Sequence, residues 1–222
     1  MRTIYSYIVY IILLLQLNSC NNEGLMYEYE HSTPIKFSSS CINVSTKSQG
    51  IIENNKLPKG SNISIFSIQH PENTTINLWE PILFDNIKGI SNFNGDIEYN
   101  NTYYFPDKEQ LDFFAIYPFL SFPTIGSDYG NTQYTTVTLK DNTVDQYDLM
   151  YASLLNQSKK SSVLVFEFHH LLTQITINII KNTGVTIDLP LTKVQIVAPQ
   201  SATLDIWHGQ LSDIAGQTTY TL

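Results

Sequence analysis

The sequence is poor in charged side chains and has almost no arginine. Charged residues make up 14% of the 222 residues, whereas they make up about a quarter of an average soluble domain. Acidic residues outnumber basic ones by 20 to 12, which gives a formal net charge of −8. Because an acidic chain gains nothing from neutralising phosphate groups, we expect no binding to nucleic acid. Arg2 is the only arginine, so an arginine-directed protease has no site in the remainder of the chain.

Cysteine is equally scarce. The two cysteines are Cys20 and Cys41, and if the first is modified, the second has no partner for an intramolecular disulfide. No histidine or lysine adjoins Cys41 in the sequence. We therefore expect Cys41 to be a small buried side chain in a strand rather than a reactive thiol.

The apolar run near the N-terminus is too short to span a membrane as a helix. It extends from Tyr7 to Leu15, which is about half of the roughly 20 residues that a spanning helix needs. It also follows a basic residue, Arg2. A short apolar run behind a basic residue is typical of a secretion signal.

This signal ends in a motif that resembles a bacterial lipobox. Leu17 lies three residues before Cys20, and the small Ser19 directly precedes the cysteine. In a lipobox the cysteine becomes the lipidated N-terminus, and a lipidated chain is anchored to the membrane rather than spanning it. Asn18 departs from the small or β-branched residue that is usual at its position. We expect a signal peptide over residues 1–19 and lipidation of Cys20; the alternative is a signal peptide that is cut elsewhere.

The rest of the chain alternates short β-prone segments with turns. No run of 12 or more residues has a helical period, and neither a βαβ alternation nor an internal repeat is visible. This pattern predicts an all-β sandwich. Residues 148–155 fit a short helix or a strand equally well, residues 162–180 fit one bent strand or two strands joined at a bulge, and Gly89 and Gly95 are expected to separate strands. The other expected strands cover residues 35–44, 62–68, 79–84, 95–101, 102–106, 111–118, 133–139, 191–197, 202–206 and 218–222.

Motifs of enzymes and metal sites are missing. The sequence has no HExxH, no paired Cys/His spacing, no GxSxG, no Walker loop and no GxGxxG, so we predict a protein that is not an enzyme and holds no metal or cofactor. Asp141, Asp145 and Asp148 lack the spacing of a calcium loop, which favours a solvated acidic loop over a calcium site. We expect His169 and His170 to have a structural role at a strand bend.

Three carboxylates allow both a chemical and a structural interpretation. Asp107, Glu109 and Asp112 are predicted to lie in a turn between two aromatic segments. A pair of carboxylates would suit glycosidase chemistry, but single carboxylates on turns are ordinary and no partner group is visible. We expect no catalysis at this turn.

Six aromatic residues in the same region could form a platform on which a sugar stacks. The competing interpretation places half of the rings in the core, and we favour it because the segments alternate and because rings supply the largest buried area. The six residues are Tyr103, Tyr104, Phe105, Phe113, Phe114 and Tyr117.

Six motifs follow the lipobox in a distinctive order. They are Ile35–Phe37, Gly60–Phe66, Tyr104–Pro106, Leu111–Pro118, Asp148–Ala152 and Phe166–Leu172. Their order and spacing resemble fimbrillin-type proteins, which are pilus subunits and related lipoproteins of anaerobic gut and oral bacteria. The resemblance covers about residues 13–206.

The resemblance implies two transthyretin-like β-sandwich domains, export as a lipoprotein, and a place on the outer membrane and in fimbriae at the cell surface. It also implies that a protease removes an N-terminal strand near Thr33–Val44 and that a strand of another pilus subunit fills the vacated groove. In such strand addition the incoming backbone completes the ladder and its alternate side chains fill the core. The candidate core-facing residues of the removable strand are Ile35, Phe37, Ile42 and Val44.

Two features depart from the fimbrillin pattern. The usual arginine-directed cut is impossible, so we expect a lysine-directed cut in the polar loop, at Lys47, Lys56 or Lys59. About 16 residues follow Ile206, which are too few for a second sandwich and a C-terminal donor strand. We therefore expect the second domain to be absent or truncated.

These observations divide the chain and assign it a role. The expected parts are a signal peptide at residues 1–19, a tether at 20–32, a fimbrillin-like β-sandwich at 33–206 and, at 207–222, a linker or the start of a truncated second domain. We predict a cell-surface lipoprotein that acts as a pilus subunit, anchor or adhesin component. Its expected partners are other pilus subunits, the membrane through its lipid, and a host or glycan ligand. The alternative is a lipid-anchored, carbohydrate-binding β-sandwich.

Overall fold

The chain divides into a compact unit, Thr33–Leu222, and a separate N-terminal unit, Met1–Ser32. The computed structural model describes residues 33–41, 55–74, 83–120, 133–141, 146–159, 163–180, 184 and 190–221. The predictions for residues 1–32, including Cys20, and for Ile42, Val44, Lys47 and Asp145 lie outside these ranges.

Within the described ranges every regular element is a strand, so the predicted all-β class is confirmed. No helix suited to crossing a membrane occurs in the same ranges. The strands are β1 (Phe37–Cys41), β2 (Asn62–Pro71), β3 (Ile87–Ser91), β4 (Asp96–Glu98), β5 (Glu109–Tyr117), β6 (Tyr134–Thr138), β7 (Met150–Gln157), β8 (Leu164–His170), β9 (Gln195–Asp205) and β10 (Gln210–Thr221).

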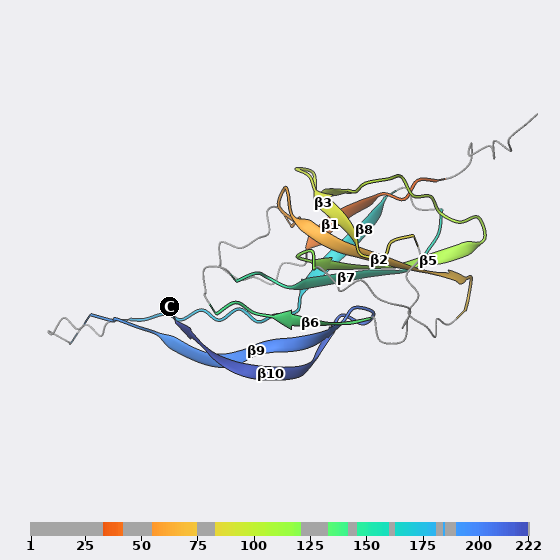
Figure 1. Cartoon of the computed structure of the whole chain (residues 1–222). Helices are drawn as coiled ribbons and strands as arrows, with labels where there is room; N and C mark the ends of the chain where they lie inside the picture. Colours follow the sequence, from red (N-terminus) through yellow and green to blue (C-terminus); the bar gives the residue numbers. More distant parts are fainter. Residues whose placement is uncertain are drawn as a thin grey trace, which may run out of the picture. The chain divides into compact units, whose positions relative to one another are not determined.

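Seven of these strands form a closed barrel (Figure 1), in the order β1-β4-β3-β2-β5-β7-β8. Neighbouring strands pair antiparallel except β1 and β8, which pair parallel from Phe37 opposite Leu164 to Cys41 opposite Phe168. On its other edge β1 pairs antiparallel with β4. A parallel ladder is slightly less stable per residue than an antiparallel one, so the β1–β8 ladder is expected to be less stable per residue than the other ladders of the barrel.

The closed barrel differs from the two-sheet sandwich that the sequence predicts. The difference arises because β1 bonds to both β4 and β8 and so connects two strands that would otherwise be edges. Closure of this kind removes the unpaired edges that an open sheet exposes.

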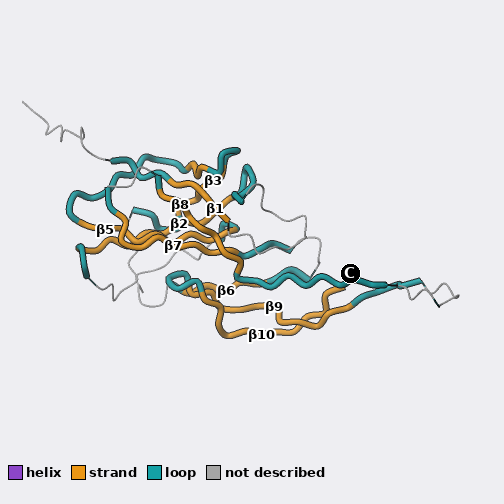
Figure 2. Tube along the Cα trace, turned by 180° about the vertical axis from the view of Figure 1, so that it is seen from behind, coloured by secondary structure: helices purple, strands orange, loops and turns teal. Residues whose placement is uncertain are grey.

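The remaining three strands form a second sheet, in the order β10-β9-β6, which is a layer of its own in both views (Figures 1 and 2). A second core cluster lies between this sheet and the outer face of the barrel. It contains Phe66 of β2 and Phe114 of β5 from the barrel, and Val137 of β6 and Leu204 of β9 from the sheet. Central barrel strands are therefore buried on both faces, which explains the strongly apolar character of β2 and β5.

Most of the described residues after Ile206 belong to this second sheet. We expected residues 207–222 to be a linker or the start of a second domain. The structure places Gln210–Thr221 in β10, which pairs antiparallel with β9 along most of its length.

Three of the expected strands are corrected by the structure. Residues 202–206 do not form a separate strand, because most of them continue β9. Of the described residues 163–180, only β8 is a strand, and residues 171–180 lie outside any strand. Residues 102–106 pair with the start of the chain only through an isolated bridge between Tyr104 and Pro34. The ambiguous residues 148–155 lie largely in strand β7.

Gly89 lies inside β3 rather than between strands, so its interpretation as a break was wrong. A Cβ atom at Gly89 would lie 2.6 Å from Cγ2 of Ile97 and 2.9 Å from Cδ1 of Ile65. The missing side chain makes room for these two isoleucines in the barrel core.

Candidate strand-exchange site

The strand β1 is hydrogen-bonded along both of its edges. The Ile35 N–H donates to the carbonyl of Tyr103 at 2.9 Å, and the Ser39 N–H donates to the carbonyl of Gly95 at 2.7 Å. On the opposite edge, the Leu164 N–H donates to the carbonyl of Lys36 at 2.8 Å. The segment from Thr33 to Cys41 therefore lies between β4 and β8 with hydrogen bonds on both sides. We call the space that this segment fills the β1 slot.

Side chains of this segment alternate between the barrel core and the outside, as a strand with one buried face requires. Ile35, Phe37, Ser39 and Cys41 face the core and are 2–3% exposed. Lys36 is exposed, and Ser38 and Ser40 are partly exposed. The prediction that Ile35 and Phe37 are core-facing residues of the first strand agrees with this arrangement.

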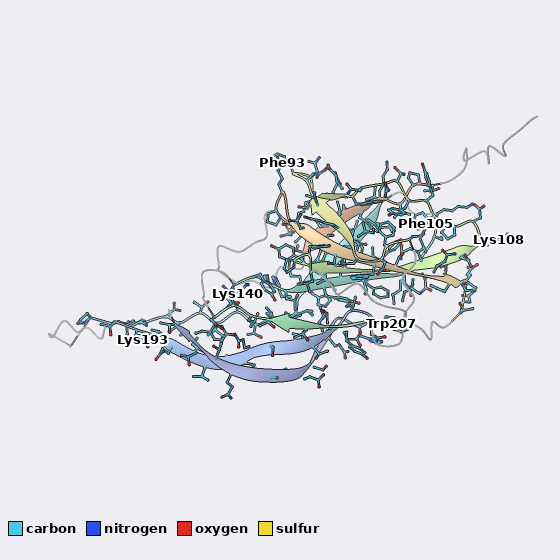
Figure 3. All side chains as sticks on the ribbon, in the orientation of Figure 1. Phe93, Phe105, Lys108, Lys140, Lys193 and Trp207 are labelled. Carbon is cyan, nitrogen blue, oxygen red and sulfur yellow. The ribbon has the colours of Figure 1, made fainter. Side chains whose placement is uncertain are left out.

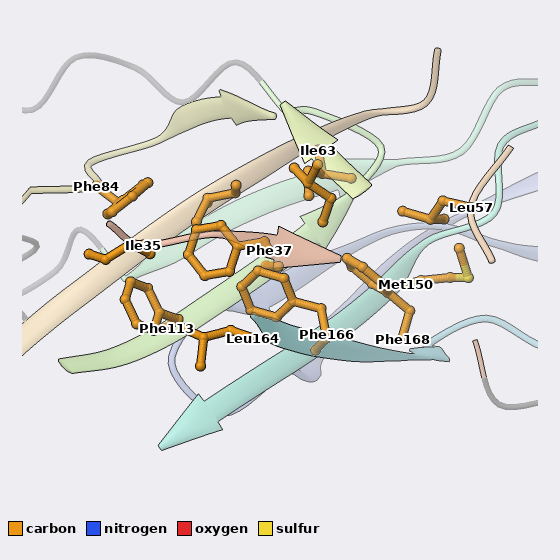
Figure 4. Close-up of a cluster of buried hydrophobic side chains, with 14 of the residues drawn as sticks. Ile35, Phe37, Leu57, Ile63, Phe84, Phe113, Met150, Leu164, Phe166 and Phe168 are labelled. Carbon is orange, nitrogen blue, oxygen red and sulfur yellow. The ribbon is translucent and has the colours of Figure 1, made fainter. Parts of the chain in front are cut away.

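Phe37 lies in a cage of aromatic rings (Figure 4). Its ring centroid is 4.9 Å from that of Phe166, 5.0 Å from that of Phe113 and 5.6 Å from that of Phe84. The Phe113 and Phe84 contacts are edge-to-face and the Phe166 contact is stacked, geometries that add to the effect of buried area alone. These rings come from β5, β8 and the segment before β3, so Phe37 joins strands from across the barrel.

Tyr99, in the turn that follows β4, contacts the start of the Thr33–Cys41 segment. Its hydroxyl donates a hydrogen bond to the carbonyl of Ile35, and its ring lies 5.8 Å from that of Phe37. Burial, followed by the charge of the neighbouring Tyr103, raises the pKa of Tyr99 to about 12. The hydroxyl therefore keeps its proton, and its hydrogen bond, at any physiological pH.

Ser39 makes the polar contact inside the slot. Its hydroxyl donates to the carbonyl of Gly95 at 3.0 Å and accepts from the N–H of Leu57 at 3.3 Å. Gly95 has a φ of +78°, a conformation that glycine adopts without strain. Leu57 is itself 2% exposed, so its N–H has little access to water.

Cys41 fills the far end of the slot, and its predicted burial in a strand is confirmed. The thiol is free. Burial, followed by the charge of Asp148, raises the pKa of Cys41 to about 11. A thiol with such a pKa is protonated at neutral pH and is a poor nucleophile.

A groove of about 500 Å³ lies beside β1 and β4. Its lining includes Lys36, Asp96, Glu98 and Val163.

Two of the three candidate processing lysines are held by contacts. The ammonium of Lys56 donates to the carbonyl of Asn94 at 2.6 Å, and the ammonium of Lys59 lies 4.1 Å from the centre of the Phe93 ring. Phe93 projects from the turn between β3 and β4 (Figure 3) and is 83% exposed. The third candidate, Lys47, lies outside the described residues.

The backbone around the first two lysines is also bound to the barrel. The Cys41 N–H donates to the carbonyl of Asn55 at 2.8 Å, and the Gly60 N–H donates to the carbonyl of Ser91 at 2.8 Å. A protease binds its substrate as an extended segment, so a cut next to Lys56 or Lys59 would first require these bonds to open.

The carboxylates near β5 have separate partners. Glu109 accepts a hydrogen bond from Gln69, and Asp107 pairs with Lys159 at 3.1 Å. The structure therefore does not arrange these carboxylates as a facing pair of the kind that glycosidases use.

The third carboxylate of that group, Asp112, is buried with His70. Asp112 accepts the Asn156 N–H at 2.6 Å and lies 3.2 Å from Nε2 of His70. Nδ1 of the same ring lies 3.0 Å from the carbonyl of Pro71. Both nitrogens face acceptors, so this histidine connects the ends of β2, β5 and β7 structurally.

The two candidate calcium residues that the structure describes, Asp141 and Asp148, have different partners. Asp141 accepts hydrogen bonds from Gln200 and Thr218, whereas Asp148 lies 2.6 Å from Nδ1 of His170. In the part of the chain that the structure describes, no three His, Cys, Asp or Glu side chains gather as metal ligands.

Three of the six candidate sugar-stacking rings are core residues. Phe105, Phe113 and Phe114 are 5%, 0% and 1% exposed. Tyr103 and Tyr117 pack partly buried against the same core, and Tyr104 is 39% exposed. No coplanar exposed platform is formed by these six residues, and the alternative role in carbohydrate binding loses its main support.

A comparison with protein-family models finds a match to the fimbrillin-like model over residues 46–222. The chain belongs to the fimbrillin-like family. The resemblance noted in its sequence is thereby confirmed. The matched region begins after β1, so the strand in the slot lies outside it. No functionally curated protein matches this fimbrillin-like chain.

Solved structures share the fold of this fimbrillin-like protein. A proposed cell adhesion protein of Bacteroides uniformis is 21% identical with a TM-score of 0.54, over 86% of this chain and 70% of its own. A fimbrial protein of Bacteroides vulgatus is 17% identical with a TM-score of 0.51, over 83% of this chain and 64% of its own.

Ser39 and Leu57 were not singled out from the sequence. Ser39 stands in a run of three serines, Ser38–Ser40, and strict alternation from Phe37 would have placed the middle serine in the core. Nothing in the sequence shows that the N–H of Leu57 donates a hydrogen bond to the hydroxyl of Ser39.

Proposed function

We propose that this fimbrillin-like chain is a cell-surface fimbrial subunit or anchor that assembles by exchange of β1. Membership of the family supports a role in fimbriae or adhesion. The observation that carries the mechanism is that, among the described strands, β1 alone joins β4 to β8. Removal of this five-residue strand would turn the barrel into an open, wholly antiparallel sheet.

An empty β1 slot would present what a strand-addition partner needs. The facing edges of β4 and β8 would offer unpaired N–H and C=O groups, and the rings of Phe84, Phe113 and Phe166 would line an apolar floor. An incoming strand would gain main-chain hydrogen bonds along both edges and bury alternate side chains in that floor. We retain the transthyretin-like sandwich as a proposal for this opened state, in which a six-stranded sheet would face the β6–β9–β10 sheet.

We place the processing cut at Lys47. The chain next to Lys56 and Lys59 is hydrogen-bonded to β1 and to β3, so a cut there would first require the bonds of Asn55 and Gly60 to open. A cut at Lys47 would sever the connection between β1 and β2 without that requirement, and the bonds of Asn55 and Leu57 to β1 would then break when β1 leaves the slot. For the precursor before this cut, we keep lipidation of Cys20 and attachment to the outer membrane as parts of the proposal, with a signal peptide at 1–19 and a tether at 20–32; the cut would release the chain from this attachment.

Exchange can be tested with the full chain carrying an engineered protease sequence between Lys47 and Gly50. After the cut, we expect a fluorescent peptide with the sequence of residues 33–44 to displace the native segment in mild urea. Fluorescence anisotropy would report the uptake. In the uncut control the tethered β1 has an effective concentration in the millimolar range, so micromolar peptide should stay unbound.

The proposal fails if the cut chain, still folded by circular dichroism, takes up no more peptide than the uncut control. Such a result would mean that β1 is a permanent part of the barrel.

A further inference from the structure

We propose that the pocket around Ser39 is a polar subsite that fixes the register of any strand occupying the β1 slot. The partner would be a strand of another subunit with a large apolar residue, an aromatic residue, a Ser or Thr, and a small apolar residue at alternate positions. This inference rests on the proposed exchange of β1 and adds the sequence that the exchanged strand must carry.

Apolar pockets alone do not define the register of an incoming strand. A slip by one residue turns the apolar side chains out of the core, but a slip by two residues returns them to the same face. A slot lined only by rings and aliphatic side chains would therefore accept several alignments of an alternating strand. One subsite with a different chemical requirement removes this ambiguity.

The Ser39 subsite has that requirement. The Leu57 N–H points at the serine hydroxyl from a residue that is 2% exposed. The Gly95 carbonyl accepts the strand's own N–H at 2.7 Å, so it remains bonded with any residue in this position. An alanine or an aromatic side chain here would leave the Leu57 N–H without an acceptor, which is unfavourable for a buried donor.

The neighbouring subsites differ in size. Phe37 occupies the ring cage described above, whereas Cys41 is a small side chain that lies opposite Phe168 in the β1–β8 ladder and belongs to the same core. A shift by two residues in one direction would bring the Phe37 ring to the Leu57 N–H and Ile35 into the ring cage. A shift in the other direction would bring Cys41 to the Leu57 N–H and Ser39 into the ring cage. Each shift removes both the hydroxyl acceptor of the Leu57 N–H and the aromatic occupant of the cage. The two effects act together against the shifted alignment.

The run of three serines provides a matched test. Ser38 and Ser40 lie on the outer face of the same strand and are partly exposed, whereas Ser39 is 2% exposed. Alanine substitution at each position removes the same atom from the same kind of side chain. Only at Ser39 does that atom bond inside the barrel.

The experiment uses the cut full chain and reduced synthetic peptides of residues 33–44 that compete with the labelled parent peptide. We expect Ser39→Ala to weaken competition by about tenfold to a hundredfold, as the loss of a buried hydrogen-bond partner implies. Ser38→Ala and Ser40→Ala should compete like the parent. Ser39→Thr, which keeps the hydroxyl, should compete better than Ser39→Ala, and a peptide with Phe37→Ser and Ser39→Phe should not compete.

The outcomes separate the two proposals. If the parent peptide is taken up and all three alanine peptides compete equally, the polar subsite is disproved while strand exchange stands. If the parent peptide is not taken up at all, exchange itself is disproved, and the register inference is overturned with it.

Discussion

A disulfide that joins β1 to β4 is expected to abolish uptake of the strand peptide by the cut chain. Ser38 and Asp96 are direct partners in the antiparallel ladder, and neither is buried. Such partners have Cα atoms about 4.5–5.5 Å apart, within the range of about 4.4–6.8 Å that disulfides span. A Ser38→Cys/Asp96→Cys chain can therefore close a bond across this seam without a rearrangement of the barrel.

This disulfide would be tested in the cut chain with the additional substitution Cys20→Ser, which leaves Cys41 as the one remaining native cysteine. When the double variant is oxidised, β1 stays covalently attached after the cut, and we expect no detectable peptide uptake. Addition of dithiothreitol should restore uptake to the level of the unstapled chain. Thiol titration in denaturant provides the control, because only Cys41 should react in the oxidised form. Equal uptake in both forms would mean that the peptide binds outside the β1 slot.

Phe37→Ala is expected to lower the free energy of unfolding by about 3–5 kcal/mol, the usual effect of truncating a buried phenylalanine. The ring is 2% exposed and contacts Phe84, Phe113 and Phe166, and rings on strands from across the barrel cannot all close around an alanine. Since a domain is stable by only about 5–15 kcal/mol, this change should remove a large part of the protein's stability. Urea denaturation followed by circular dichroism measures it.

Phe93→Ala is the matched control for this substitution. Phe93 is 83% exposed and its ring contacts the ammonium of Lys59, so its loss should change stability by less than about 1 kcal/mol. Similar destabilisation by the two substitutions would show that Phe37 does not anchor β1 in the core.

Strands with a strong local pattern were predictable from the sequence. β2 and β5 are rich in isoleucine and phenylalanine and lie within residues 62–71 and 109–117, close to the predicted bounds. Because both faces of these two strands are buried, their sequences are strongly apolar, and this local pattern predicts a strand without knowledge of the neighbouring strands. β3 was missed because Gly89 suggested a break, whereas the glycine is required by the close approach of Ile65 and Ile97.

Closure of the barrel could not be predicted from local patterns. It depends on pairing between β1 and β8, whose partners Phe37 and Leu164 lie far apart in the sequence. The apolar alternation of each strand shows that one face is buried but does not say which strand lies beside it. The expected sandwich and the observed barrel share this alternation, and only the hydrogen bonds of β1 distinguish them.

The candidate site was only partly predictable, because local patterns show which side chains of a strand are buried but not which segments pack against them. Alternation identified Ile35 and Phe37 as core-facing residues of the first strand. The polar contact of Ser39 with Leu57 depends on a chain segment that returns to the slot from beyond the loop. Contacts of this kind are tertiary and leave no periodic signal in the sequence.

The most direct test of strand exchange is N-terminal sequencing and intact-mass analysis of the protein recovered from assembled fimbriae at the native cell surface. We predict a mature chain that begins after Lys47 and lacks residues 33–41. A chain that begins at a lipidated Cys20 and retains β1 in the assembled fraction would contradict the exchange mechanism, and would identify the protein as an anchored terminal subunit or binding protein.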